Sequence, residues 1–183
     1  ADVGWVIDQT GPTTIQRSNN KIESAPDIGV EMNDVVSTDN SITHIVFKDD
    51  TKVEINDHSR LLIDSFVYDP NRSTGKLSMK AMMGTVRYAS GAIAHNNPSS
   101  VNVETPTATI GVRGTDFTMT VDELGRSLVI LLPSCPTGFK SIEKDCKTGK
   151  IVVKTYSDEV ELDRPFQATV VNSREKAPTK PVI

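Results

Sequence analysis

The sequence predicts an all-β protein in which short antiparallel strands form a twisted sandwich or a solenoid-like stack. Val, Ile and Thr together supply 53 of the 183 residues, whereas Leu and Ala supply only 17. β-Branched side chains are stiff at χ1 and pack well on a pleated surface, so this ratio favours strands. Turn residues recur about every 8–12 residues, as in sandwiches and barrels. No segment has the periodicity of a long helix.

In the first half of the chain, apolar runs alternate with turn signals such as Gly11-Pro12. The clearest strand is residues 51–55, where apolar and charged residues alternate as on a strand with one solvated face. Two further runs flank Gly84, and we expect them to pair as a hairpin. The strands expected in this half are 3–9, 13–17, short strands within 27–38, 41–47, 51–55, 59–68, 76–83 and 85–88.

Residues 90–100 contain Gly91, Asn96, Asn97 and Pro98, which predicts a long loop. Beyond it we expect strands at 101–104, 117–121, 128–132, 151–156, 160–162 and 166–171. The last residues contain two prolines with charged neighbours, so we expect an extended tail. The expected organisation is a β domain at 1–121, a β extension with a cysteine loop at 122–171, and the tail at 172–183.

Composition excludes several classes of protein. With 37% hydrophobic residues, 24% charged residues and a net charge of −4, the chain is typical of globular proteins. A pI near 5.4 argues against a dedicated nucleic-acid binder. No apolar run reaches the ~18 residues of a membrane-spanning helix, so we expect no membrane insertion. A start at Ala1 fits either a cleaved signal peptide or a removed initiator Met, and both readings stay open.

Cys135 and Cys146 are the two cysteines, and they enclose a polar loop between strand-like runs. A zinc site would need further ligands at closer spacing, and a catalytic thiol would need a neighbouring base. We therefore expect a disulfide, with two free thiols as the alternative. A bridge over so short a loop would stabilise the fold by about 2–3 kcal/mol and would indicate an oxidising location.

No arrangement of residues predicts catalysis or a cofactor. A metal site formed by His44, His58 and nearby Asp residues is conceivable, but the spacing favours ordinary surface histidines. Asp64 with Glu104 is the one carboxylate pair worth testing for sugar hydrolysis. Trp5, near the start, either packs over its own core or docks on the sheet edge of a neighbouring subunit.

Residues 105–117, Thr-Pro-Thr-Ala-Thr-Ile-Gly-Val-Arg-Gly-Thr-Asp-Phe, resemble the closing signature of the FecR domain. The other pieces of that family's pattern precede it in order, at 34–38, 47–53, 59–64 and 76–87. Asp50 stands where the family usually has Gly. The resemblance covers about residues 10–121 and implies an extracytoplasmic β module.

The signature also has a physical interpretation. Gly111 and Gly114 bracket Val112-Arg113, which predicts a positive φ or a close backbone approach. We expect Arg113 to be at least half-buried and to tie strands together, through a carboxylate or backbone carbonyls. Candidate partners are Asp116, Asp64 and Glu104. The alternative is that Arg113 grips an anionic ligand or partner.

In one class of the family, the resemblance implies relay of a siderophore-receptor signal across the inner membrane to a sigma factor. Stand-alone FecR-like domains resemble this chain too, and occur in secreted or surface proteins and in virions of large tailed marine phages. This sequence offers no candidate for the cytoplasmic anti-sigma segment or the transmembrane helix of the first class. We therefore expect a non-enzymatic structural subunit of an extracellular or virion assembly, a homo-oligomer joined through strand edges and extended ends. The alternative is a periplasmic sensing or ligand-binding module that relays a signal through a partner protein.

Overall fold

Strands dominate the computed structural model, which describes residues 1–97, 99–135 and 145–183 and confirms the all-β prediction. The elements of the described residues are β1 Asp2–Gln9, β2 Thr13–Arg17, β3 Asn20–Glu23, β4 Gly29–Glu31, β5 Val35–Thr38, β6 Thr43–Phe47, β7 Lys52–Ile55, β8 Arg60–Asp69, β9 Thr74–Ala89, α1 Ala92–Asn96, β10 Val101–Glu104, β11 Thr109–Arg113, β12 Asp116–Val121, β13 Ser127–Leu132, β14 Lys150–Lys154, β15 Glu159–Leu162 and β16 Ala168–Val171. Within these residues, no helix is long and apolar enough to cross a membrane.

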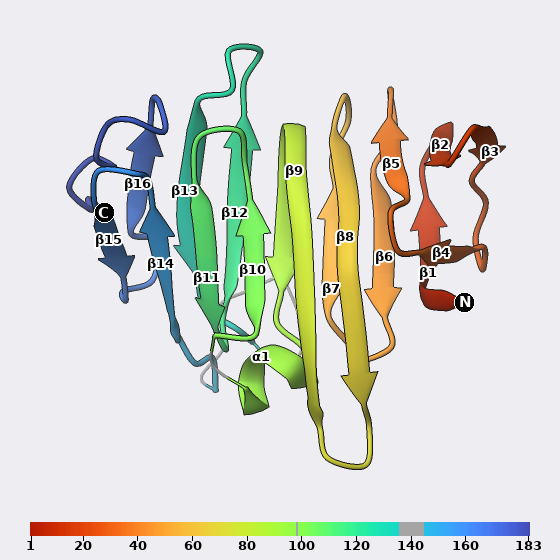
Figure 1. Cartoon of the computed structure of the whole chain (residues 1–183), viewed down its shortest axis with the longest axis horizontal. Coiled ribbons are helices and arrows are strands. Elements are labelled where there is room, and N and C mark those ends of the chain that lie inside the picture. Colours follow the sequence, from red (N-terminus) through yellow and green to blue (C-terminus); the bar gives the residue numbers. More distant parts are fainter. Residues whose placement is uncertain (98, 136–144) are drawn as a thin grey trace.

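The strands form two layers that share β9 (Figure 1). Sheet A has the order β4-β1-β6-β7-β9-β12-β13-β16, and sheet B has the order β3-β2-β5-β8-β9-β10-β11-β14-β15. Every named pairing is antiparallel except β9 with β10. After most hairpins the chain passes to the other layer, so the fold is a sandwich whose successive hairpins alternate between the two sheets.

The prediction of a hairpin around Gly84 is wrong, because residues 74–89 form one continuous strand. The first part of β9 pairs with β8 in sheet B, and the part after Gly84 pairs with β7 and β12 in sheet A. Gly84 has a φ of +84°, and a Cβ there would lie 2.1 Å from the hydroxyl of Ser59. Glycine here bends a strand from one layer into the other rather than reversing the chain.

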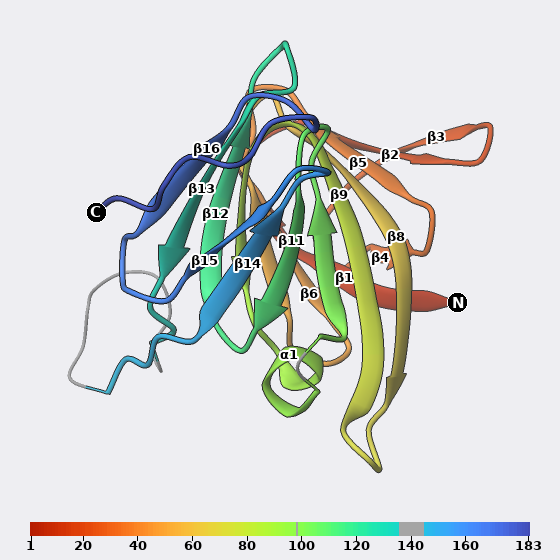
Figure 2. The same ribbon diagram turned by 60° about the vertical axis from the view of Figure 1, so that its left-hand side comes forward.

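The two layers converge at one end and diverge at the other, where α1 lies between them (Figure 2). Phe47 of sheet A stacks on Phe66 of sheet B, with ring centroids 5.6 Å apart. Ile93 of α1 is fully buried, and its N–H donates to the buried carboxylate of Asp49 at 3.1 Å. The short helix, in a segment that we expected to be a loop, therefore closes the wide end of the core.

Both ends of the chain are engaged within the molecule. β1 lies inside sheet A, between β4 and β6. The tail runs along the outermost strand β16, where Val182 and Ala168 exchange backbone hydrogen bonds of 2.7 and 3.0 Å. Thr179 N also donates to Val170 O at 3.0 Å. β1 is thus an internal strand of sheet A that contributes Val3 and Val6 to the core, and the tail covers one edge of the sandwich.

Candidate binding face

The side chain of Arg113 is exposed, whereas we expected it to be at least half-buried. The residue ends β11 with its side chain exposed on the outer face of sheet B, because the alternation of the strand turns Ile110 and Val112 into the core. Among the described residues its side chain forms no hydrogen bond or ion pair, and its cross-strand neighbour is Lys150. The expectation of a half-buried arginine that ties strands together is therefore wrong for this residue.

The expected partners of Arg113 lie apart from it. Asp64 is exposed on β8, where its carboxylate accepts a hydrogen bond of 2.9 Å from the hydroxyl of Ser78. Glu104 lies on β10, in register with Thr109. Asp116 begins β12 in sheet A, the opposite layer. The geometry joins none of these three carboxylates to the arginine.

Arg17 fills the structural role that we had assigned to Arg113. Its guanidinium donates to the fully buried Asp34 through Nε at 3.0 Å and Nη2 at 2.8 Å. Its Nη1 lies 2.9 Å from Glu31. This clamp joins β2 of sheet B to the end of β4 in sheet A. Nothing in the spacing of these residues along the sequence pointed to it.

The two signature glycines differ. Gly114 has a φ of +62°, as the sequence suggested, and directly follows the exposed Arg113. At Gly111, a Cβ would meet only Asn102 Oδ1, at 3.9 Å. Its missing side chain leaves a hollow of about 150 Å³ on the outer face of sheet B, and Arg113 and Lys154 are among the residues that line it.

The first half of the signature is a structural turn. The hydroxyl of Thr105 accepts hydrogen bonds from the N–H groups of Thr107 and Ala108, at 3.2 and 3.0 Å. Arg174, just before the tail segment on β16, donates to Thr105 O at 2.8 Å and to Pro106 O at 3.1 Å. These bonds fix the β10–β11 connection and leave it no free donor for a ligand.

Asp116 lies in sheet A and is almost fully buried. Its carboxylate accepts the N–H of Ser90 at 3.2 Å. Burial raises the pKa of Asp116 to about 6, although the Ser90 N–H and the positive charge of Arg87 act in the opposite direction. This residue joins the end of β9 to the start of β12.

The histidines do not gather at one site. His44 lies on the outer face of sheet A between two carboxylates, with Nδ1 2.5 Å from Asp8 and Nε2 2.9 Å from Glu54. Burial alone would lower the pKa of His44, but the hydrogen bonds to both carboxylates raise it above its ordinary value. His58 lies 3.2 Å from Asp39 instead.

The predicted disulfide and Trp5 also have clear positions. The Cys135–Cys146 disulfide is confirmed, while most of the loop that it closes lies outside the described residues. Trp5 is 39% exposed on β1, in register with Val46 and Gly29. Its ring therefore lies on the surface of sheet A, and the inner core is formed by its neighbour Val6.

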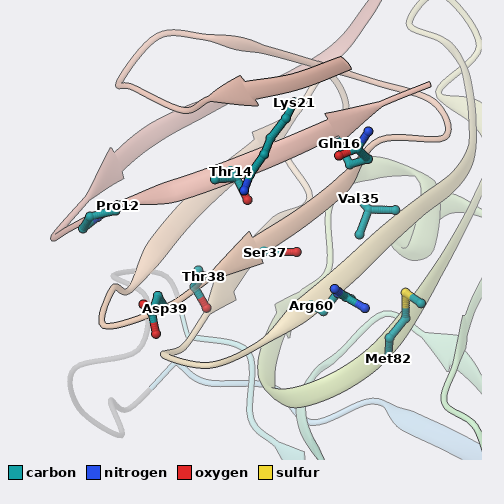
Figure 3. Close-up of a pocket in the computed structure, with 10 residues that line it drawn as sticks. All are labelled: Pro12, Thr14, Gln16, Lys21, Val35, Ser37, Thr38, Asp39, Arg60 and Met82. Carbon is teal, nitrogen blue, oxygen red and sulfur yellow. The ribbon is translucent and has the colours of Figure 1, made fainter. Parts of the chain in front are cut away.

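A groove on the outer face of sheet B is the feature that the sequence did not indicate (Figure 3). Its volume is about 660 Å³, and its walls come from five strands, the residue before β2 and the residue after β5. The lining residues are Pro12, Thr14, Gln16, Lys21, Val35, Ser37, Thr38, Asp39, Arg60 and Met82. No sequence signal found it, because strands distant in the chain supply the lining.

The groove offers hydrogen-bond donors that the fold leaves unused. Among the described residues, the side chains of Arg60, Lys21, Thr14 and Ser37 form no ion pair or hydrogen bond. The one carboxylate in the lining, Asp39, faces His58. A cationic fork with nearby hydroxyls suits carboxylates, which accept from arginine in a planar, paired geometry. The groove can therefore hold an anionic, hydrogen-bonding segment.

Comparisons with known proteins agree with this architecture. The family model described as FecR protein matches residues 33–132. Two crystal structures of a protein from Parabacteroides distasonis ATCC 8503, provisionally named an anti-sigma factor, share the fold with TM-scores of 0.55 and 0.53, each at 15% identity. Each match covers 79% of this chain and 57% of that one, so this chain spans little more than half of that protein. Among curated proteins, none matches.

Proposed function

The chain belongs to the FecR protein family, and from this premise we propose that it is a signalling module that binds a segment of a partner protein on the outer face of sheet B. The module acts by binding rather than by catalysis. Family membership and the provisional name of the structural neighbour favour a regulatory role over that of a particle subunit. The disulfide supports an extracytoplasmic location, because such bonds persist in oxidising compartments.

One observation carries the choice of site: the groove contains the cations Arg60 and Lys21 and the hydroxyls of Thr14 and Ser37, whose side chains form no ion pair or hydrogen bond among the described residues. An arginine in a concavity, with the Thr14 and Ser37 hydroxyls alongside, favours recognition of carboxylates. We infer that the bound segment of the partner is acidic.

A peptide titration tests this proposal. The probe is a fluorescein-labelled decapeptide of alternating Glu and Ser, followed by anisotropy at low ionic strength. The Arg60→Glu variant should weaken binding at least tenfold, because it removes a charge-assisted bond and adds a like charge. Arg72→Glu makes the same charge change on the exposed β8–β9 turn and should leave the affinity within twofold.

Two outcomes would overturn the proposed site. In one, a matched Lys-Ser decapeptide binds as tightly as the Glu-Ser peptide. In the other, Arg72→Glu weakens binding as much as Arg60→Glu, which would mean that only the net charge of the molecule matters. Testing Arg113→Glu in the same titration shows whether the hollow at Gly111 belongs to the same binding face.

A further inference from the structure

Four strand edges bound the two sheets in the described part of the chain, and two of them are already occupied. The tail covers the edge of β16 through the hydrogen bonds of Val182 and Thr179. At β4, side chains bond the outward backbone groups: Arg17 donates to Gly29 O at 3.1 Å, and Asp34 accepts from Glu31 N at 2.8 Å. Neither edge offers a row of free backbone groups.

The third edge, β15, opposes association with its own copy. Glu159 and Glu161 are exposed on this strand, on either side of Val160. Antiparallel pairing with a second β15 about Val160 would place Glu159 opposite Glu161 of the second copy. Like charges directly opposite each other destabilise a strand pair. Edge strands are commonly protected in this way.

The fourth edge, β3, is open. It is the outer strand of the β2–β3 hairpin, which projects beyond the two layers (Figure 2). Ser24 N donates to Thr13 O at 2.8 Å, so the bonded positions alternate along the hairpin. Asn20 and Ile22 share that phase and bond to β2. The N–H and C=O groups of Lys21 and Glu23 therefore point away from the sheet.

The side chains of β3 are self-complementary, with a cation and an anion at equal distances from Ile22. Antiparallel pairing with a second β3 about Ile22 places Lys21 opposite Glu23 of the second copy, and Glu23 opposite Lys21 of the second copy. These are the positions whose backbone groups point outward, so each opposed pair also exchanges both backbone hydrogen bonds. Charge and backbone thus require the same register.

We propose that the chain forms a symmetric dimer in which β3 pairs antiparallel with β3 of a second copy, making sheet B continuous across the two-fold axis. The interface is isologous and closes after two copies, so it yields a dimer and no polymer. Lys21 and Glu23 share one face of the strand, because residues two apart point the same way. Ile22, half-buried against the core, meets its counterpart on the other face.

The dimer is expected to be weak. A strand of four residues contributes few backbone bonds and buries less surface than the ~1,000 Å² of a stable interface. Association should therefore appear as a fast, concentration-dependent equilibrium. Sedimentation velocity on the full chain from 5 µM to 1 mM, at low and high salt, measures it. Salt should weaken the dimer, because its cross-strand ion pairs are exposed.

Charge reversal provides a sharp test. Lys21→Glu or Glu23→Lys alone places like charges opposite each other across the dyad, and each should weaken dimerisation at least tenfold. The partners of these residues inside the hairpin are the neutral Gln16 and Thr14, so the monomer loses no ion pair. The double swap, Lys21→Glu with Glu23→Lys, restores complementarity and should dimerise like the native chain.

Mixing the two single variants gives a second test. Each alone should be monomeric, whereas an equimolar mixture should form a heterodimer, because one edge then carries two anions and the other two cations. Glu159→Ala on β15 is the matched control and should leave dimerisation unchanged. Arg60→Glu should also leave it unchanged, so failure of the groove proposal and failure of this one are distinguishable.

Three results would overturn the dimer. The first is a monomer throughout the concentration range. The second is a polymer that grows with concentration, since a two-fold contact closes. The third is a dimer that survives both single reversals with native affinity, which would place the contact elsewhere. Circular dichroism of each variant confirms that loss of association is not loss of fold.

Discussion

The outer faces of the two sheets handle charge in opposite ways. On sheet A, Asp8, His44 and Glu54 lie side by side on β1, β6 and β7, and the two histidine nitrogens each face a carboxylate. On sheet B, Arg60 and Arg113 form no ion pair within the described residues. The charged cluster on sheet A is paired within the fold, whereas these two cations of sheet B have no charged partner among the described residues. We take this difference as the reason for placing binding on sheet B.

Two arginines show how strand alternation and position produce the difference. Arg17 ends β2 at the side of the sandwich, where the connection between β4 and β5 brings Asp34 within 2.8 Å. Arg113 ends β11 on the outer surface, where the facing residue is Lys150. Residue type is the same in both cases. The neighbouring strand determines whether the guanidinium stabilises the fold or remains free to bind.

The largest effect is expected when the Arg17 clamp is broken. Arg17→Ala leaves the fully buried Asp34 without its cation, and because the Arg17 side chain is itself 30% exposed, we expect a loss of about 3 kcal/mol, the lower end of the range for a fully buried pair. Urea unfolding followed by circular dichroism at pH 7 measures the loss. Arg17→Lys keeps the charge but not the paired geometry and should fall between the two. A loss below about 1 kcal/mol for the alanine variant would contradict the clamp.

A second prediction concerns Asp116. Its pKa in the folded protein, about 6, lies above its ordinary 3.8, so its contribution to stability is fully present at low pH and is lost as pH rises from about 4 through 6. The shift amounts to about 3 kcal/mol. Asp116→Asn, which stays neutral, should therefore be more stable than the native chain at pH 7.5 by up to that amount. Urea unfolding of both proteins at pH 4 and pH 7.5 tests the difference. If the variant and the native chain have equal free energies of unfolding at both pH values, the carboxylate is better solvated than its burial indicates.

A smaller pH effect of the same sign, at higher pH, should come from His44. Its raised pKa means that the folded state holds the proton more tightly than the unfolded chain does. This stabilisation is fully present below the ordinary pKa of 6.5 and is lost as pH rises through the raised value. His44→Gln should remove the dependence. The measurement is the free energy of unfolding of both chains between pH 5.5 and 9, and parallel curves would mean that the two carboxylates do not hold the proton.

The smallest effect should come from Arg113. Arg113→Ala removes no described hydrogen bond or ion pair, so the free energy of unfolding should change by less than about 0.5 kcal/mol. The same urea experiment as for Arg17 provides the comparison. A loss of 2 kcal/mol or more would restore a structural role to Arg113 and would remove the contrast between the two arginines.

Local patterns predicted most of the strands. The alternating run at 51–55 became β7, and residues 13–17 and 101–104 are strands with the expected bounds. Errors arose where the meaning of a residue depends on distant contacts. Gly84 was interpreted as a turn, and it bends β9 because Ser59 approaches it closely. Residues 20–23 were not among the expected strands, yet they form β3 and pair with β2 on an exposed edge whose one apolar residue is Ile22.

The sequence by itself determined the fold class, the family and the cysteine bridge, because β-branched content, turn spacing, the signature at 105–117 and the two cysteines are local properties of the chain. Only the tertiary structure decided which arginine is clamped, which sheet face keeps free cations and which edge is open. Those outcomes depend on which strands become neighbours. Pairing joins residues far apart in sequence, such as Arg60 with Met83 and Thr14 with Ser37, and no local pattern records that choice.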